Sequence, residues 1–265
     1  AVCAAHTEKT CYDGNENGYG CPWQVFPGGV TKNTYRGTCV ECLRTCPQNN
    51  VAIQLRPFGA DLYQPAGRKL DEAYKAFIML GAALAYSAVL LGPWGAVKTA
   101  AYAVGTSGWA LYAAGLLAFL LVGLPGLFYL AVLAGKKWAG VYSRSARQLF
   151  IALAYALVPL GLTAWMAFSL AFVFPNLSYL WPTLSDPLGW GWNLLGSAGA
   201  AWKPYLTGLA PTLQAGVLLL GLLWAARVAR RISAEFAGGA RGERLALPVS
   251  AFCLLVTLGL MVLLV

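Results

Sequence analysis

Six of the seven cysteines lie within the first 46 residues, and their spacing is the feature of the chain that most clearly suggests chemistry. Three of them form the run Cys39-x2-Cys42-x3-Cys46, which is followed directly by Pro47. Thiolates at this spacing hold iron–sulfur clusters: the cysteines of a tight loop bind one cluster, and the last cysteine reaches a second cluster. The proline fixes φ and removes an amide, so the chain leaves the loop cleanly. The pattern predicts iron–sulfur chemistry.

A looser group upstream also ends in Cys-Pro. It contains Cys3, His6, Cys11 and Cys21, and the residues before Cys21 are rich in the turn formers glycine, asparagine and aspartate. Two such groups, 25 residues apart at their Cys-Pro ends, predict a small α+β two-cluster ferredoxin-like module. The alternation of apolar residues over 51–55 predicts a short closing strand.

In a two-cluster fold, the last cysteine of each run binds the other cluster. The expected ligands of cluster one are Cys3, His6, Cys11 and Cys46, although His6 can also be an ordinary loop histidine. The expected ligands of cluster two are Cys21, Cys39 and Cys42. Its fourth position falls on Arg36, which cannot bind iron because guanidinium stays protonated. Cluster two is therefore a 3Fe-4S species, or a 4Fe-4S species with one corner held by another group, unless residue 36 is misassigned.

Zinc is the competing metal, because cysteine and histidine at short spacing also form tetrahedral zinc sites. The two Cys-Pro endings and the unequal x2 and x3 spacers favour iron–sulfur. Disulfides are not expected for a module on the cytoplasmic side of a membrane.

The composition divides the chain. It is 58% hydrophobic and 11% charged, whereas a soluble domain is about 25% charged. Residues 1–75 carry 15 charges and residues 76–265 carry 14, so a single soluble domain and a secreted disulfide scaffold are excluded. We expect an iron–sulfur module at 1–62, an amphipathic linker at 63–75 and an α-helical transmembrane domain at 76–265. Membrane topology explains the net charge of +9 better than nucleic-acid binding does.

About five segments are apolar and long enough to cross a bilayer. They are Ala76–Gly92, Trp109–Gly135, Leu149–Pro175, Leu209–Ala226 and Leu245–Val265. The stretch Pro93–Gly108 is expected to be interfacial, and Pro125, Pro159 and Pro248 mark expected kinks. The chain begins without methionine or a signal peptide and ends flush with the last span, which suggests a fragment or a processed product.

Basic residues before span one, between spans two and three, and between spans four and five all fall on one face. By the positive-inside rule this face is cytoplasmic. The sequence therefore predicts an integral inner-membrane protein with a cytoplasmic cysteine module and its C-terminus outside.

The expected spans carry no Asp, Glu, Lys, Arg or His, which disfavours ion-coupled transport by this chain. Haem held between two helical histidines is excluded, because His6 is the only histidine.

Quinone binding by the helices stays open. Hydrogen-bonding candidates are Tyr86, Tyr112, Tyr155 and Gln214, each of which fits an interhelical contact better. The aromatic loop Asn176–Gly208 fits a headgroup-level belt, or otherwise a docking surface or quinone mouth.

Three stretches together resemble one known family. They are Cys11-Tyr-x-Gly14-x3-Gly18-Tyr-Gly-Cys21-Pro-Trp23, Tyr35-x-Gly37-x-Cys39-x2-Cys42-Leu-x-Thr-Cys46-Pro, and Asn50-Val-Ala-Ile-x-Leu-Arg56-Pro-Phe-Gly59-x-Asp61-Leu. Over residues 3–62 the chain resembles the polyferredoxin-type 4Fe-4S membrane proteins related to electron-donor and maturation subunits of nitrous oxide and nitrate reduction. The resemblance implies a cytoplasmic two-cluster relay that exchanges electrons between the quinone pool or a soluble carrier and a partner complex. In that family position 36 is ordinarily cysteine, and further helices precede this region.

The expected function is therefore that of a membrane-anchored iron–sulfur electron-transfer subunit of a respiratory redox complex. Its partners are membrane lipid, other subunits and a soluble carrier, with no nucleic acid. The soluble part shows no catalytic residue set, so no substrate chemistry of its own is expected. The alternative is a zinc-stabilised cytoplasmic module on a membrane scaffold or assembly protein.

Overall fold

A computed structural model describes residues 8–29, 37, 39–53, 55–65, 67–92 and 94–265. The chain divides into two units, Ala1–Gly67 and Arg68–Val265. The first holds the clustered cysteines and the second holds the apolar helices, so each is described separately.

The described part of the first unit consists of short helical turns joined by loops. These are α2 (Thr10–Asp13), η1 (Pro27–Gly29), α3 (Glu41–Arg44) and η2 (Ala60–Tyr63). Its described residues form one isolated bridge, between Asn15 and Gly18, and no strand. The expected α+β character of this module is therefore not supported.

The expected strand at 51–55 illustrates the physical reason. Its alternating pattern is real, but Ile53 is 71% exposed and Leu55 is 98% exposed. A strand is stabilised by a neighbour that pairs its backbone and covers one of its faces. Residues 51–53 and 55 have neither among the described residues and stay irregular, so the prediction of a strand is wrong for them.

The described residues of the second unit contain five helical segments long and apolar enough to span a membrane, as the sequence predicts. They run Leu70–Leu91, Ser107–Ala139, Ala146–Ser185, Thr207–Phe236 and Gly239–Leu264. Each begins before the expected span, because polar first and last turns continue a helix beyond its hydrophobic part. The first helix accordingly starts within the expected linker.

The helical unit is built from consecutive helices, several of which join through π-helical or 3-10 turns. In chain order they are α4 (Leu70–Tyr86), η3 (Ser87–Leu91), α5 (Gly95–Tyr102), α6 (Ser107–Ala118), η4 (Phe119–Gly123), α7 (Leu124–Ala139), α8 (Ala146–Ala154), α9 (Leu157–Asn176), η5 (Leu177–Tyr179), α10 (Leu180–Ser185), η6 (Thr207–Leu209), α11 (Ala210–Phe236) and α12 (Gly239–Leu264).

Local signals place several of the helix ends. The Ser145 hydroxyl and the Gln148 side chain form a capping box that starts α8. Gly140 ends α7 with a φ of +65°, which glycine adopts without strain. Pro125 follows η4 and Pro159 lies in the first turn of α9, where a missing N–H costs little. In contrast, α12 continues through Pro248.

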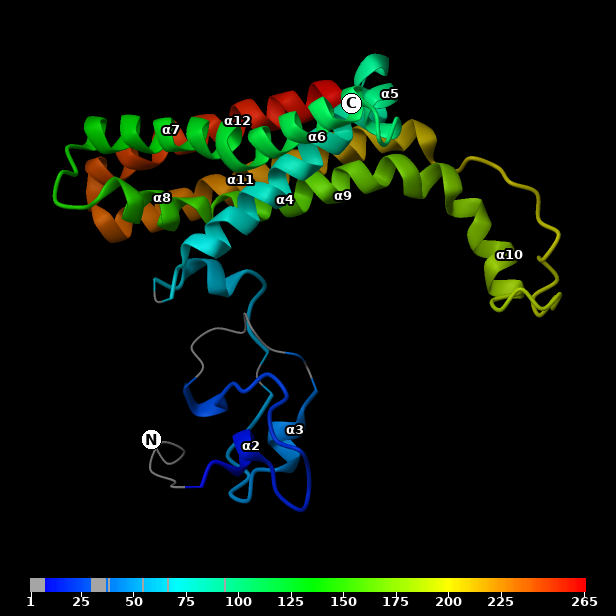
Figure 1. Ribbon diagram of the computed structural model, residues 1–265, viewed down its shortest axis with the longest axis horizontal. Coiled ribbons are helices and arrows are strands. Elements are labelled where there is room, and N and C mark those ends of the chain that lie inside the picture. Colours follow the sequence, from blue (N-terminus) through cyan, green and yellow to red (C-terminus); the bar gives the residue numbers. More distant parts are fainter. Residues whose placement is uncertain (1–7, 30–36, 38, 54, 66, 93) are drawn as a thin grey trace. The chain divides into compact units, whose positions relative to one another are not determined.

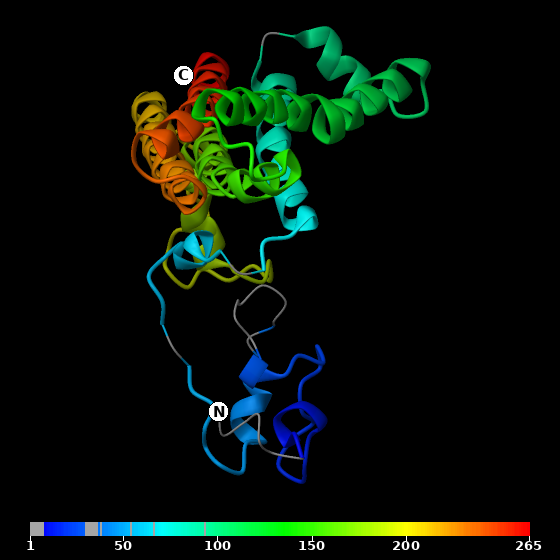
Figure 2. The ribbon, with the colours of Figure 1, turned by 90° about the vertical axis from the view of Figure 1, so that its left-hand side faces the viewer.

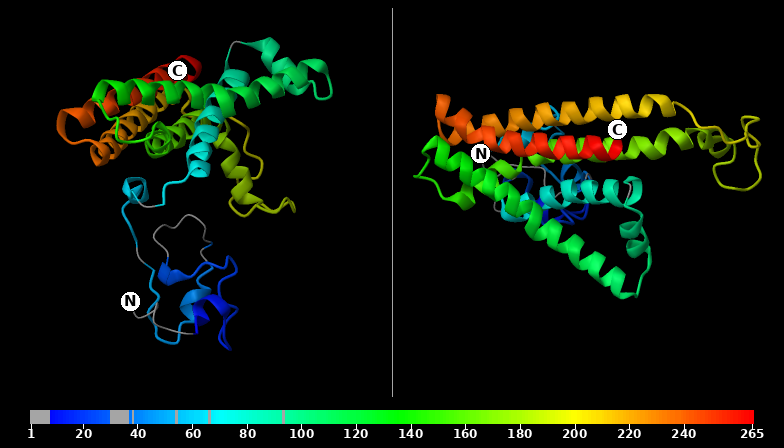
Figure 3. Two further views of the ribbon diagram at one scale, coloured as in Figure 1. Left: turned by 60° about the vertical axis from the view of Figure 1, so that its left-hand side comes forward. Right: turned by 90° about the horizontal axis from the view of Figure 1, so that it is seen from above.

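Helix α9 packs between α4 and α11, and α12 packs against α11 and α7 (Figures 1 and 3). A cluster of phenylalanines ties four helices together, with ring centroids 5.2 to 5.8 Å apart. Its members are Phe77 of α4, Phe128 of α7, Phe150 of α8 and Phe252 of α12. This aromatic contact lies at the core of the bundle.

The α5–α6 hairpin projects from the rest of the bundle (Figures 2 and 3). No residue of α5 or α6 is buried, and α5 is too short to span a bilayer. The short helix α5 fits the expectation of an interfacial segment between the first two spans.

Candidate metal centre

The two Cys-Pro turns of the first unit have the same local structure. In each, the backbone N–H four residues after the cysteine donates to its sulfur: Val25 N lies 3.3 Å from Cys21 Sγ, and Asn50 N lies 3.4 Å from Cys46 Sγ. Such N–H···S bonds stabilise a thiolate. The two Cys-Pro segments that the sequence singles out thus share a local turn.

The backbone conformation repeats as well. The residue three positions after each cysteine, Gln24 and Asn49, has a φ of +50°. Its N–H also donates to the cysteine carbonyl, at 3.0 Å after Cys21 and 3.3 Å after Cys46. A left-handed backbone conformation raises the free energy of most residues other than glycine and asparagine. Its occurrence at matching positions is a feature that the spacing of the cysteines alone did not reveal.

The surroundings of Cys46 favour the ionised form that binds metals. Burial raises the pKa of the Cys46 thiol, but the surrounding backbone N–H groups outweigh it and hold the pKa below its ordinary value. These N–H groups belong to Asn50, Gln48, Val51 and Asn49. Because the thiolate is the metal ligand, this arrangement prepares Cys46 for coordination.

Cys11 and Cys46 line the same small cavity. The sequence assigns both to cluster one. The cavity has a volume of about 40 Å³, more than the ~10–15 Å³ that one water molecule needs on the same measure. The described side chains therefore enclose room for a single ion or for the edge of a larger group.

Hydrogen bonds clamp the first cysteine-bearing segment onto the second. The Thr10 hydroxyl and the Asn15 amide both donate to the carbonyl of buried Thr45, at 2.9 and 3.1 Å. The backbone N–H of Tyr19 donates to the Glu41 carboxylate at 3.3 Å. These bonds position Cys11 relative to Cys46, because Thr45 directly precedes Cys46. Glu41 thus has a positioning role that its residue type alone did not predict.

The expected ligands of cluster two are less closely connected. Cys42 lies on α3, and exposed Cys39 precedes it by three residues. The segment after Cys21 contacts the segment before Cys39, since a Cβ at Gly37 would lie 2.7 Å from Nε1 of Trp23. The contact brings these two parts of the chain together, as a shared ligand set requires.

The described residues do not complete a metal site. No three His, Cys, Asp or Glu side chains among them lie close enough to hold one ion together. Cys3, His6 and Arg36 lie outside the described residues. Two of the four expected cluster-one ligands, Cys11 and Cys46, therefore line one cavity in the part of the chain that the structure describes.

No family model, no curated protein and no solved structure matches the chain. The assignment of a function therefore rests on the cysteine turns and on the chemistry of the helical unit.

The helical unit carries a partly buried polar cluster that the sequence did not predict. The Arg68 guanidinium forms two hydrogen bonds with the Glu235 carboxylate, at 2.7 and 3.0 Å, and its side chain is only 6% exposed. The Tyr155 hydroxyl donates to Glu72 and accepts the backbone N–H of Lys69. Arg68, Lys69 and Glu72 lie just before and in the first turn of α4, and Glu235 lies at the end of α11, all outside the expected spans, whereas Tyr155 follows α8 inside the third expected span.

The quinone candidates do not form one site. Gln214 donates to the carbonyl of Ala167 at 2.9 Å, which confirms the expected interhelical contact. Tyr155 belongs to the polar cluster, and Tyr86 packs on Trp165 and Phe168. A cavity of about 760 Å³ lies among α4, η3, η4, α7 and α12. Its lining is almost wholly apolar, and none of the four candidates belongs to it.

Proposed function

We propose that the chain is a membrane-anchored iron–sulfur electron-transfer protein whose cysteine unit binds the clusters. The observation that carries this proposal is the repeated Cys-Pro turn, in which a backbone N–H reaches the sulfur of Cys21 and of Cys46. Backbone amides aimed at cysteine sulfur offset the negative charge of a thiolate-bound cluster and tune its reduction potential.

The cysteines present would hold the clusters as the spacing assigns them. Cys11 and Cys46 would contribute to one cluster, and Cys21, Cys39 and Cys42 to the other, with Cys3 and His6 completing the first. An iron–sulfur cluster supplies one-electron transfer at a potential set by its charge and hydrogen bonds. The chain's own part is to hold the thiolates, to lower the pKa of Cys46 and to donate the amide hydrogen bonds.

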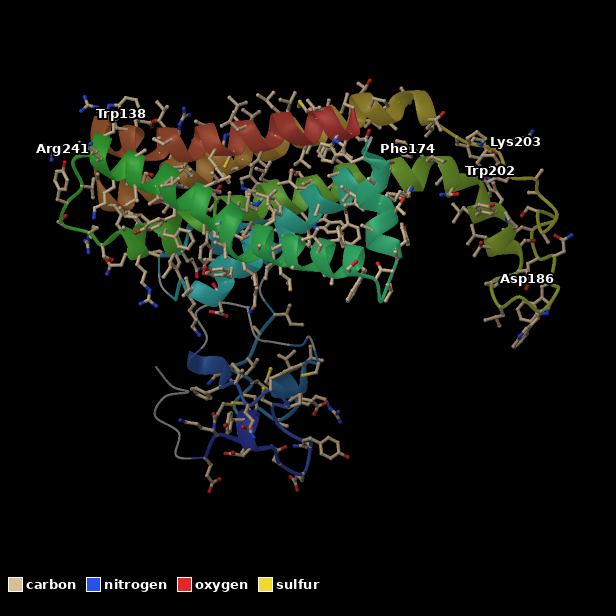
Figure 4. The ribbon with its side chains drawn as sticks, turned by 45° about the horizontal axis from the view of Figure 1, so that its top comes forward. Trp138, Phe174, Asp186, Trp202, Lys203 and Arg241 are labelled. Atoms are coloured by element: carbon tan, nitrogen blue, oxygen red, sulfur yellow. The ribbon has the colours of Figure 1, made fainter. Side chains whose placement is uncertain are left out.

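The direction of insertion is part of the proposal. Twelve basic residues lie at the ends of helices on one side of the bundle, against Lys98 and Lys203 on the other. Figure 4 shows Arg241 at one end and Lys203 at the opposite end. By the positive-inside rule, the basic end and the cysteine unit that joins it at Arg68 face the cytoplasm.

A second candidate function has a specific observation in its favour. The cavity beside Cys11 and Cys46 has room for one ion, and a structural zinc ion takes four Cys or His ligands, a set that Cys3, His6, Cys11 and Cys46 would supply. A zinc-bound unit would stabilise a membrane scaffold and transfer no electrons.

Metal analysis of the full chain, purified without oxygen, decides between the two. We expect iron and acid-labile sulfide in comparable amounts, a brown colour and an electron paramagnetic resonance signal. Cys46→Ser and Cys21→Ser should each lose iron and sulfide. Cys253→Ser is the matched control, because Cys253 is buried in α12 and is not part of the cysteine unit. Zinc without sulfide would establish the second candidate, and a colourless, metal-free protein would reject both.

A further inference from the structure

The loop of residues 176–208 is folded with polar groups inside. Ser178 and Ser185 are buried. The Ser185 hydroxyl donates to the Asn193 side-chain oxygen at 3.0 Å and accepts the backbone N–H of Leu195 at 3.1 Å. The same Asn193 oxygen accepts the N–H of Ala198. The loop thus satisfies much of its own polar backbone, as a segment placed in an apolar medium must.

Residues 197–203, in the second half of the loop, are hydrogen-bonded to residues 175–181, at the end of α9 and the start of the loop. The Trp202 indole N–H donates to the carbonyl of Pro175 at 3.0 Å, and Lys203 N donates to the Ser178 hydroxyl at 3.1 Å. The Ser197 hydroxyl donates to the carbonyl of Trp181 at 2.9 Å. Figure 4 shows Trp202 and Lys203 between Phe174 and the tip that carries Asp186. These bonds give the loop a defined fold.

Large apolar side chains cover the outside of this loop. Trp190 is 69% exposed, and its ring meets that of Trp192 edge to face at 5.0 Å. Other exposed members are Trp181, Leu188, Leu194 and Leu195. The 33 residues carry only two charges, Asp186 and Lys203, and the Asp186 carboxylate accepts the N–H groups of Trp190 and Gly191. Such a surface is unfavourable in water and must be covered.

The apolar surface of the loop continues that of the spanning helices. Phe172 and Val173 at the end of α9 are exposed, as are Leu209 and Leu213 at the start of α11. In Figure 1, α10 turns steeply away from the direction of α9, so it runs across the bundle axis, as a helix lying along a membrane surface does. Trp and Tyr are enriched in protein interfaces and in membrane-interface belts alike, so the continuity of this surface with that of the spanning helices decides between the two occupants. Lipid is therefore the occupant that fits.

We propose that residues 176–208 form an interfacial lobe that inserts its tryptophans and leucines into the headgroup boundary at the end of the bundle opposite the basic end. Indole rings prefer this level of the bilayer, where the ring is apolar and the N–H reaches polar partners. The lobe anchors the outer ends of α9 and α11. This inference is independent of what the cysteine unit binds.

Fluorescence of the full chain in phosphatidylcholine vesicles tests this placement. Vesicles carry bromine, which quenches tryptophan, either on shallow or on deep acyl carbons. Subtracting the signal of the Trp190→Phe/Trp192→Phe variant isolates these two tryptophans, and each single variant serves if the double one does not fold. Trp138→Phe is the matched reference, since Trp138 is also exposed and lies at the opposite boundary (Figure 4).

We expect bromines on shallow acyl carbons to quench the fluorescence of Trp190 and Trp192 more than bromines on deep carbons do. Trp138 should likewise be quenched more by the shallow bromines. Aqueous acrylamide should quench it weakly. Strong quenching by acrylamide without any effect of bromine would place the loop in water and overturn the proposal. Protection from both quenchers would also overturn it, because another protein or a second copy of the chain would then cover the loop.

Discussion

At the scale of single residues, the two Cys-Pro cysteines differ from an ordinary thiol through their backbone. Pro22 and Pro47 turn the chain back, so that the N–H four residues later reaches the sulfur. At Cys46 the summed effect of four such amides exceeds the desolvation that opposes it. The chemistry of the site therefore depends on main-chain geometry as much as on cysteine spacing.

The lowered pKa of Cys46 predicts its reactivity in the metal-free chain. We expect its alkylation by iodoacetamide, followed by mass spectrometry of the Cys46 peptide, to have a pH midpoint below the ~8.5 of an ordinary cysteine. Unfolding the same protein in urea should return the midpoint to that value. Because the folded pKa is the lower one, the thiolate stabilises the unit above the unfolded pKa, and this contribution is lost as the pH falls through the folded pKa. Equal midpoints in both states would contradict the amide effect.

At the scale of elements, sequence patterns predict what is local and miss what depends on a partner. The apolar windows identify all five spanning segments, and the Ser145-x2-Gln148 pattern is typical of the capping box observed. The prediction of a strand at 51–55 was wrong because the alternation of apolar residues does not by itself supply a neighbouring strand to pair with. The Arg68–Glu235 pair joins residues 167 positions apart, and no spacing rule connects them.

One close helix contact has a direct test. A Cβ at Gly135 of α7 would lie 2.6 Å from the Leu245 carbonyl oxygen of α12, and a backbone atom cannot yield as a side chain can. We expect Gly135→Ala to destabilise the bundle by about 1–3 kcal/mol, as overpacking does. Thermal unfolding in detergent measures the effect. Gly126→Ala in the same helix is the control, because no atom lies within 4 Å of its Cβ position. Equal stability of the two variants would disprove the contact.

The Arg68–Glu235 pair is expected to hold the first turn of α4 against the end of α11. Arg68→Gln leaves the Glu235 carboxylate without its paired charge, and we expect a loss of about 1–3 kcal/mol. Arg230→Gln is the matched control, since the Arg230–Glu243 pair lies at 3.3 Å with both side chains 62% exposed. Exposed pairs contribute about 0–1 kcal/mol. Similar unfolding temperatures for both variants would show that burial adds nothing to the Arg68 pair.

At the scale of the whole molecule, composition divides the chain more clearly than cysteine spacing defines the site. Charge and hydropathy separate a cysteine-rich unit from a helical one, in keeping with the two units Ala1–Gly67 and Arg68–Val265. The spacing also pairs Cys11 with Cys46, which line one cavity. The other two expected ligands, Cys3 and His6, lie outside the described residues, and the spacing does not reveal loop conformations such as the left-handed Gln24 and Asn49. Loop conformations of this kind leave little trace in the spacing of cysteines.

The distribution of charge over the molecule predicts its direction in the membrane. Lys136, Lys137, Arg144 and Arg147 flank the α7–α8 connection, whereas the 176–208 loop carries a single basic residue. An epitope inserted after Ser143 should be protected from impermeant reagents on intact cells, and one inserted after Gly189 should be accessible. Replacing the four basic residues by glutamine removes one of three basic groups, so the orientation should persist but be less uniform. Accessibility of the Ser143 epitope in the unaltered protein would reverse the assignment, and with it the cytoplasmic placement of the cysteine unit.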